Sequence, residues 1–145
     1  MGKMDHVVYI NRSCQELDKL ITGCRTMLVR GSTGKKVPYG RVSEGDRLFF
    51  ATGNSTRNVV KAAAAVDSVY DSEKLSGIEP ECLIAEHMDK LQLTEVEMGK
   101  WSQKKYLTLI GIADTSPVVP FSISVRGNGE SDDWIVVDDI DEIIE

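Results

Sequence analysis

Apolar residues along the first half of the chain recur at spacings typical of both strands and helices. Leu17, Leu20 and Ile21 fall on one face of a helix, and Gly23 suits the left-handed conformation just beyond a helix end. Residues 13–16 have the pattern of a capping box, so we expect that helix to begin there. Runs rich in β-branched and aromatic residues or in alanine predict strands at residues 6–11, 48–51 and 59–69.

The second half predicts helices first and strands afterwards. A helix opens at residues 79–81, and its apolar stripe runs through His87 to Leu91. A second capping box at residues 94–97 begins another helix, which we expect to end near Gln103. The remaining segments predict strands at 106–113 and 118–125 joined by a turn at 114–117 as a hairpin, a loop at 127–133, a strand at 134–137 and a short C-terminal helix.

Strands interleaved with helices in this order predict an α+β fold with a mixed sheet or barrel. A chain of 145 residues suits one domain that spans residues 1–145 and buries its own core. No apolar run reaches the length of a membrane span, and the N-terminus lacks the apolar segment of a signal peptide. We therefore expect a cytoplasmic protein without a membrane partner.

Cysteine and histidine are too scarce to indicate a metal centre or a disulfide framework. The three cysteines are widely spaced and contain no Cys-x-x-Cys pair, and the chain has two histidines. Residues 29–36 lack the first glycine and the final hydroxyl of a P-loop, so we expect no P-loop there. We predict no metal site and no cofactor; the oligomeric state stays open.

Charge is unevenly distributed, although the net charge is −6. Residues 1–61 carry a net charge of +6, and residues 62–145 carry −12. An acidic protein with a local basic patch can still direct a phosphate-bearing ligand to one place. The alternative is that the two signs intermix once the chain folds.

A distinctive motif follows the first predicted helix, at residues 23–31. If this segment is a strand, Arg25 shares one face with Met27, while Thr26 and Arg30 lie on the other. Charged side chains alternating with apolar ones favour the edge of a site over a plain core strand. A glycine-rich loop and a Gly-Asp turn leading into an apolar strand come next, at residues 30–40 and 45–50.

These segments resemble the ASCH family of the PUA-like superfamily over roughly residues 6–125. The family motif reads glycine, any residue, lysine, two residues, glutamate, any residue, arginine, and Gly23 and Arg30 match it. Arg25 stands where lysine is usual, and Leu28 stands where glutamate is usual. The resemblance implies a PUA-like mixed β-pseudo-barrel with flanking helices.

Recognition of RNA or a nucleotide-like ligand is the function we predict from these residues. Arginine forms a planar fork for phosphates and base edges, and aromatic rings stack on unpaired bases. We expect a basic cleft, with a second surface around Trp101. The candidate binding residues are Arg25, Thr26, Arg30, Lys35, Lys36, Tyr39, Arg41, Arg47 and Trp101.

Two alternatives stay open. Some members of the resembled family are small amidohydrolases that remove an acyl group from modified cytidine, and Thr26 is the conceivable nucleophile here, with Glu44 or Asp46 as its partner. Arg25 cannot replace a lysine base, because arginine stays protonated near neutrality. The other alternative is a protein-interaction module whose partner binds the acidic C-terminal half.

Overall fold

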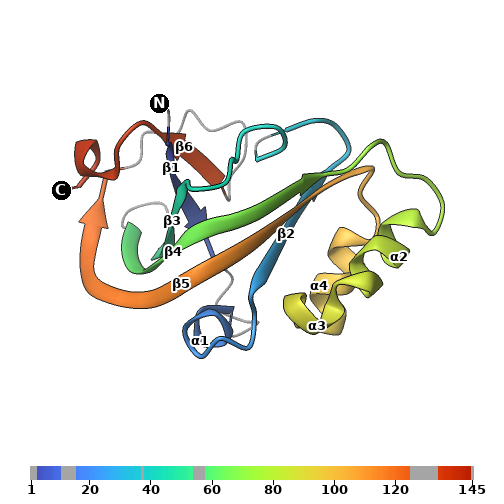
Figure 1. The fold of residues 1–145 in the computed structure, drawn as a ribbon, viewed down its shortest axis with the longest axis horizontal. Coiled ribbons are helices and arrows are strands. Elements are labelled where there is room, and N and C mark those ends of the chain that lie inside the picture. Colours follow the sequence, from blue (N-terminus) through green and yellow to red (C-terminus); the bar gives the residue numbers. More distant parts are fainter. Residues whose placement is uncertain (1–2, 11–15, 37, 54–57, 125–133, 145) are drawn as a thin grey trace.

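In the part of the chain that the structure describes, six strands form one mixed sheet that curls into a half-barrel, with four helices beside it (Figure 1). The computed structural model describes residues 3–10, 16–36, 38–53, 58–124 and 134–144. The strands are β1 (Asp5–Tyr9), β2 (Met27–Ser32), β3 (Arg47–Gly53), β4 (Asn58–Asp71), β5 (Tyr106–Ile123) and β6 (Trp134–Val137). The helices are α1 (Glu16–Ile21), α2 (Glu79–Glu86), α3 (Met88–Leu91) and α4 (Glu95–Trp101), followed by a 3₁₀ helix, η2 (Ile140–Glu142).

Strand order in the sheet is β2-β5-β4-β3-β1-β6, which leaves β2 and β6 at the two edges. β1 pairs with β3 in parallel, and the other described pairs are antiparallel. The two edge strands therefore face the open side of the curl. This arrangement confirms the predicted α+β fold with a mixed, barrel-like sheet.

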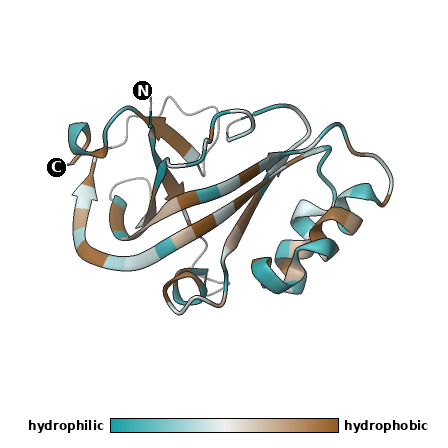
Figure 2. Ribbon diagram, viewed as in Figure 1, coloured by the Kyte–Doolittle hydropathy of each residue, from teal (hydrophilic) through white to brown (hydrophobic). Residues whose placement is uncertain are grey.

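Both faces of β1, β2 and β3 are covered along most of their length, which explains why these strands read as nearly continuous apolar runs. Along β2, Leu28 packs inside the curl with Phe50 and Trp134, while Val29 packs on the other face with helix residues such as Trp101. A third cluster joins β1, β3, β4, β5 and η2. Figure 2 shows hydrophobic residues concentrated in the strands, while hydrophobic and hydrophilic residues alternate along the helices.

The predicted hairpin at residues 106–125 is wrong, because β5 is one strand of 18 residues. Its pairing with β4 continues through the expected turn, where Ala62 pairs with Pro117 and Ala63 with Ser116. The register shifts at three places along this pair, and Asp114 has a positive φ of 55°. Bulges bend a strand and admit proline and left-handed residues, so turn-prone residues here curve the sheet without reversing the chain.

The expected helix through His87 also differs, because it breaks there into α2 and α3. His87 is half-buried, and its Nδ1 lies 3.1 Å from the Leu83 carbonyl oxygen. The predicted capping box at Thr94 and Glu97 is confirmed, although α4 ends at Trp101, short of Gln103. The predicted short C-terminal helix is the single 3₁₀ turn η2.

Two sequence predictions lie outside the described residues: the capping box at 13–16, apart from Glu16 itself, and the loop at 127–133. Within the described ranges, no helix is long and apolar enough to cross a membrane.

Candidate ligand-binding pocket

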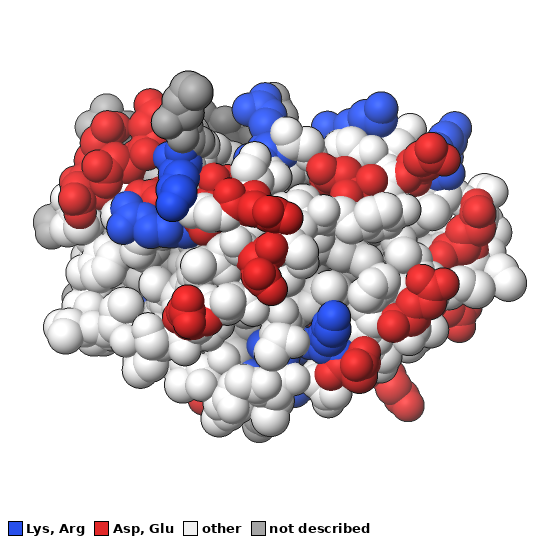
Figure 3. Space-filling view, in the orientation of Figure 1, with Lys and Arg blue, Asp and Glu red and all other residues white. Residues whose placement is uncertain are grey.

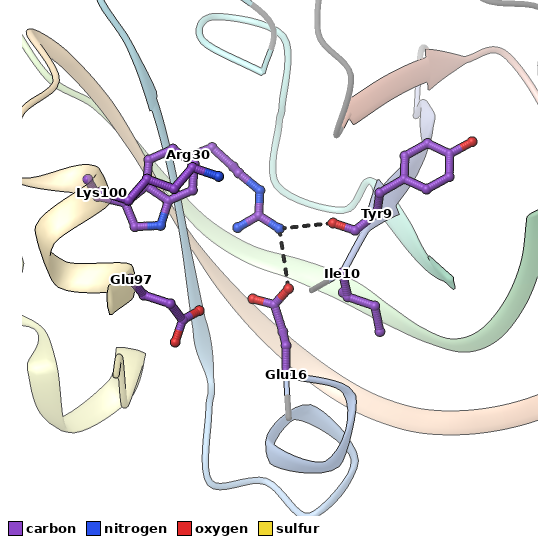
Figure 4. A pocket seen from close by; sticks show the side chains of 7 residues that line it. Tyr9, Ile10, Glu16, Arg30, Glu97 and Lys100 are labelled. Carbon is purple, nitrogen blue, oxygen red and sulfur yellow. Dashed lines mark hydrogen bonds and ion pairs between the residues drawn. The ribbon is translucent and has the colours of Figure 1, made fainter. Parts of the chain in front are cut away.

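A pocket of about 170 Å³ lies where α1, α4 and β2 meet the end of β1 (Figure 4). It sits on the open side of the half-barrel, beside β2, which is an edge strand of the described sheet. Charged groups and aromatic rings share its wall, so it is a mixed polar site. The lining residues are Tyr9, Ile10, Glu16, Arg30, Glu97, Lys100 and Trp101.

Arg30 reaches from β2 across the open side of the sheet. Its Nη1 donates to its neighbour, the Val29 carbonyl, at 2.8 Å, and its Nη2 reaches the Tyr9 carbonyl at 3.5 Å and Glu16 Oε1 at 3.6 Å. The guanidinium carbon also lies 5.7 Å from the Trp101 ring centroid. One side chain therefore links β2 to the end of β1 and forms part of the pocket wall (Figure 4).

Arg25 lies behind the pocket wall, with 1% of its surface exposed. Its Nη1 donates to Glu16 Oε2 at 2.5 Å, and its Nη2 donates to Glu97 Oε1 at 2.8 Å and to the Gln92 carbonyl at 3.0 Å. Because β2 begins at Met27, strand alternation does not govern Arg25, and it shares Glu16 with Arg30. The expectation that the two arginines face opposite ways is therefore wrong.

Glu97 is held by the start of its own helix as well as by Arg25. It is the third residue of α4, and its side chain accepts from the Thr94 backbone N–H at 3.0 Å. Burial alone raises the pKa of this carboxyl, but the hydrogen bonds from Arg25 and Thr94 and the charges of Arg25 and Lys19 bring the pKa below its ordinary value. Glu97 is therefore a fixed carboxylate at neutral pH.

Lys100 and Trp101 form the outer part of the wall at the end of α4. The exposed Lys100 ammonium lies 4.5 Å from the Trp101 ring centroid, and Trp101 itself is 6% exposed. With Arg30 on the same ring, two cations contact one indole. Burial raises the pKa of the Tyr9 phenol, which therefore stays protonated near neutral pH.

The balance of charge around the pocket is close to even. Arg25, Arg30 and Lys100 face the carboxylates Glu16 and Glu97, which leaves a formal charge of only +1. The site can donate and accept hydrogen bonds, in contrast to the basic cleft predicted from the sequence. Such a wall suits a ligand that carries both donors and acceptors more than a bare phosphate.

Thr26 is separated from the other predicted residues of its motif. It is exposed, it is not a lining residue of the pocket, and its backbone N–H donates to the Lys90 carbonyl at 2.9 Å. Asp46, one of its expected partners, is committed elsewhere: it accepts from His6 at 2.8 Å and from the backbone N–H groups of Met4 and Ser43. No described residue forms a hydrogen bond with the Thr26 side chain.

The remaining predicted cations lie outside the pocket. Lys35, Lys36 and Arg41 are exposed on the segment after β2, where Tyr39 donates from its hydroxyl to the Ser72 carbonyl. Arg47 forms two hydrogen bonds with Asp5, at 2.8 and 2.7 Å, and this contact with Asp5 raises the pKa of Arg47. Of the nine predicted binding residues, Arg30 and Trp101 line the pocket, and Arg25 supports it.

Sequence reasoning missed both carboxylates of the pocket and its wall at the end of β1. Glu16 and Glu97 were visible only as capping-box residues, whose expected partners are local. Their shared partner Arg25 is 9 and 72 residues away in the chain. Arg25, close to an expected helix end, indicates an ion pair in this region. The sequence does not show which two carboxylates form it.

Solved structures of an ASCH protein match the curled sheet and its helices. The crystal structure of ASCH from Zymomonas mobilis has a TM-score of 0.62 and 13% sequence identity, over 90% of this chain and 85% of that one. The fold is ASCH-like. Tyrosine-to-phenylalanine and serine-to-alanine mutants of the same protein also score 0.62 over 90% of this chain, with 88% and 86% of their own chains covered and 13% and 12% identity. No protein-family model and no curated protein sequence matches the chain, so the likeness concerns the ASCH-like fold alone.

Proposed function

We propose that the pocket binds an RNA base or a nucleotide-like ligand. The observation that carries this proposal is the Trp101 ring, contacted by Arg30 and Lys100 beside two fixed carboxylates. A nucleobase offers a flat face for stacking on an aromatic ring or a guanidinium plane, and an edge that both donates and accepts hydrogen bonds. This wall has partners for the face and for the edge.

Size favours a single base or nucleoside over a larger ligand. The pocket of about 170 Å³ is smaller than the roughly 300–1,000 Å³ of sites for drug-sized molecules. Proteins that read single-stranded RNA take individual unstacked bases into such small sites. A duplex has no unstacked base to insert, so we expect single strands, loops or free nucleotides to bind.

Each charged residue has its own role in this proposal. Arg30 and Lys100 contact the ligand, Arg30 through its planar fork and Lys100 through a phosphate or the sugar edge. Glu16 and Glu97 accept from the donors of the base. Arg25 holds both carboxylates in place, because its nitrogen atoms bind them from behind the wall, and is a positioning residue.

Titration with tryptophan fluorescence tests this proposal, because Trp101 reports on the pocket. The titrations measure the affinities of the wild type, Lys100→Gln and Arg30→Lys. The ligands are nucleosides, 5′-nucleotides, single-stranded RNA, structured RNA and duplex DNA. Lys90→Gln is the matched control, an exposed lysine on α3. We expect saturable quenching by single-stranded ligands. Loss of the exposed Lys100 contact should weaken binding about two- to fivefold, and loss of the arginine fork should weaken it about tenfold or more.

The proposal fails if no nucleoside, nucleotide or RNA changes the fluorescence, or if both pocket variants bind as tightly as Lys90→Gln while remaining folded by circular dichroism.

Hydrolysis of acylated cytidine through Thr26 has less support, because Thr26 lies outside the pocket lining and has no described side-chain partner. Turnover of acylated cytidine that Thr26→Val abolishes would favour the hydrolase. A partner bound by the acidic C-terminal half in nuclease-treated extract would favour a protein-interaction module.

A further inference from the structure

Lysines and tyrosines gather at the end of the β2–β5 pair, a short distance along β2 from the pocket. Ser32 pairs with Tyr106 at this end, and the Lys105 backbone N–H donates to the Ser32 carbonyl at 3.2 Å. Ser32 follows Arg30 by two residues, which is about 7 Å along a strand. We call this area the lysine–tyrosine surface, defined by Lys35, Lys36, Tyr39, Lys104, Lys105 and Tyr106.

The two tyrosines form a fixed aromatic pair on this surface. Their ring centroids are 5.5 Å apart at an interplanar angle of 79°, and both residues are half-buried. The Tyr39 hydroxyl donates to the Ser72 carbonyl, which anchors that ring to the end of β4. The Lys35 ammonium lies 5.8 Å from each ring centroid. A cation is therefore held beside two partly exposed rings.

The lysines of this surface are available to an external anion. Lys36 and Lys105 are exposed, Lys104 is half-buried, and none of them lies within salt-bridge distance of a carboxylate among the described residues. The Lys104 stem crosses Gly31, where a Cβ would lie 3.0 Å from Lys104 Cγ. The nearby Asp71 carboxylate accepts through Oδ1 from the Gly40 backbone N–H and from Thr108 Oγ1.

Figure 3 shows cationic side chains along the upper edge of the molecule, where Figure 1 places the segment after β2. Acidic side chains dominate the C-terminal end and the α2 side in the same view. The protein carries a net charge of −6, so most of its surface repels a polyanion. A local cationic edge on an acidic protein restricts a nucleic acid to one place.

We propose that the lysine–tyrosine surface binds the backbone phosphates and a base of single-stranded RNA next to the nucleotide held in the pocket. The inference rests on the proposed function, because β2 joins the two sites. Lysine ammonium groups neutralise phosphates, and tyrosine rings stack on the faces of unpaired bases. The ligand is then a stretch of several nucleotides, and a free nucleoside fills only the pocket.

The length and salt dependence of binding test this inference. A 5′-mononucleotide and a ten-nucleotide single-stranded RNA are titrated at 50 and 200 mM salt against the double variant Lys36→Gln/Lys105→Gln. The control is Lys3→Gln/Lys90→Gln, which removes the same charge from exposed lysines elsewhere. Each lost phosphate contact on a single strand lowers the log–log salt slope by roughly 0.7, so the surface variant should lose about 1.4. The wild type then weakens about sevenfold more than the variant between the two salt concentrations.

We expect the ten-nucleotide RNA to bind the wild type more tightly than the mononucleotide, and the surface variant to lose that advantage while the control variant keeps it. Equal affinity for both lengths, equal salt slopes for the two double variants, or equally tight binding of duplex DNA overturns the inference. Failure of the proposed function gives a different result: Lys100→Gln and Arg30→Lys then leave the affinity for the mononucleotide unchanged.

Discussion

Arg25 and Glu97 lie 72 positions apart in the chain and meet through a two-pronged ion pair, Nη2 to Oε1 at 2.8 Å and Nη1 to Oε2 at 3.2 Å. The same guanidinium also binds Glu16, so one buried cation ties α1 to α4. This contact sets the distance between the two helices that form opposite sides of the pocket. The stability of the fold and the shape of the site therefore depend on the same atoms.

Replacing Arg25 with methionine should destabilise the protein strongly. The change leaves Glu16 and Glu97 buried without their shared counter-charge, and breaking a buried pair from one side costs about 3–5 kcal/mol of unfolding free energy. Urea denaturation measures the loss. A triple variant that adds Glu16→Gln and Glu97→Gln should regain part of it, because no buried carboxylate is left without a counter-charge, although Arg30 then loses its contact with the charge of Glu16. Equal stability of the single and triple variants would show that charge burial is not the cause.

Acidification should weaken the fold through the buried His6, which lies between Asp46 and Trp134. The Trp134 Nε1–H donates to His6 Nδ1 at 3.0 Å, so the ring proton sits on Nε2 and donates to Asp46 Oδ2 at 2.8 Å. Burial lowers the pKa of His6 below 6.5, although Asp46 opposes the shift. As the pH falls, His6 therefore becomes protonated in the unfolded chain before it does so in the folded protein. Stability is full above pH 6.5 and falls as the pH drops from there toward the lowered pKa.

Proton NMR titration of the His6 ring should give a midpoint below 6.5, and urea unfolding should show the matching loss between pH 7.5 and 5. A His6→Gln variant should lose that part of the pH dependence. A His6 midpoint above 6.5 contradicts the assignment. The fold loses further stability at lower pH, because the pKa of Asp46 lies below 3.8 in the folded protein. Burial alone would raise this pKa, but hydrogen bonds from His6, Ser43 and Met4 lower it.

Gly31 should tolerate no side chain, whereas Gly34 should accept one. A Cβ at Gly31 would lie 2.6 Å from Leu107 Cδ2 and 2.9 Å from the Tyr106 carbonyl oxygen, and a Cβ at Gly34 would meet no atom within 4 Å. Overpacking of this kind costs about 1–3 kcal/mol, so Gly31→Ala should lower the thermal midpoint and Gly34→Ala should leave it nearly unchanged. Equal midpoints for the two variants would contradict the close approach of β2 and β5.

Local patterns predicted the helices and strands well where one signal dominated. Thr94 and Glu97 form the capping box that their spacing indicates. The apolar runs at residues 48–51 and 59–69 lie in strands, as expected. The hairpin prediction failed at Asp114 and Pro117, because residues that favour turns also favour bulges. Only the continued pairing with β4, a contact between distant segments, decides between the two.

Only part of the site was predictable from the sequence. Arg30 and Trp101 were among the candidates and line the pocket, but Arg25 proved to be bound behind it by Glu16 and Glu97. Arg47 shows the same difficulty, since its partner Asp5 is 42 residues away. A sequence shows which residues are charged, while long-range ion pairs decide which of them remain available to a ligand.

In the part of the chain that the structure describes, the Arg30 side chain bonds β2 to the end of β1, and the sheet order places no backbone ladder between these two strands. A rotamer change is far faster than the separation of paired strands. Amide hydrogens on the open edge of β2 should therefore exchange with solvent well before those of the central β4, which is paired on both sides. This side of the half-barrel is therefore held by a side-chain contact beside the pocket, and such a contact rearranges faster than a backbone ladder.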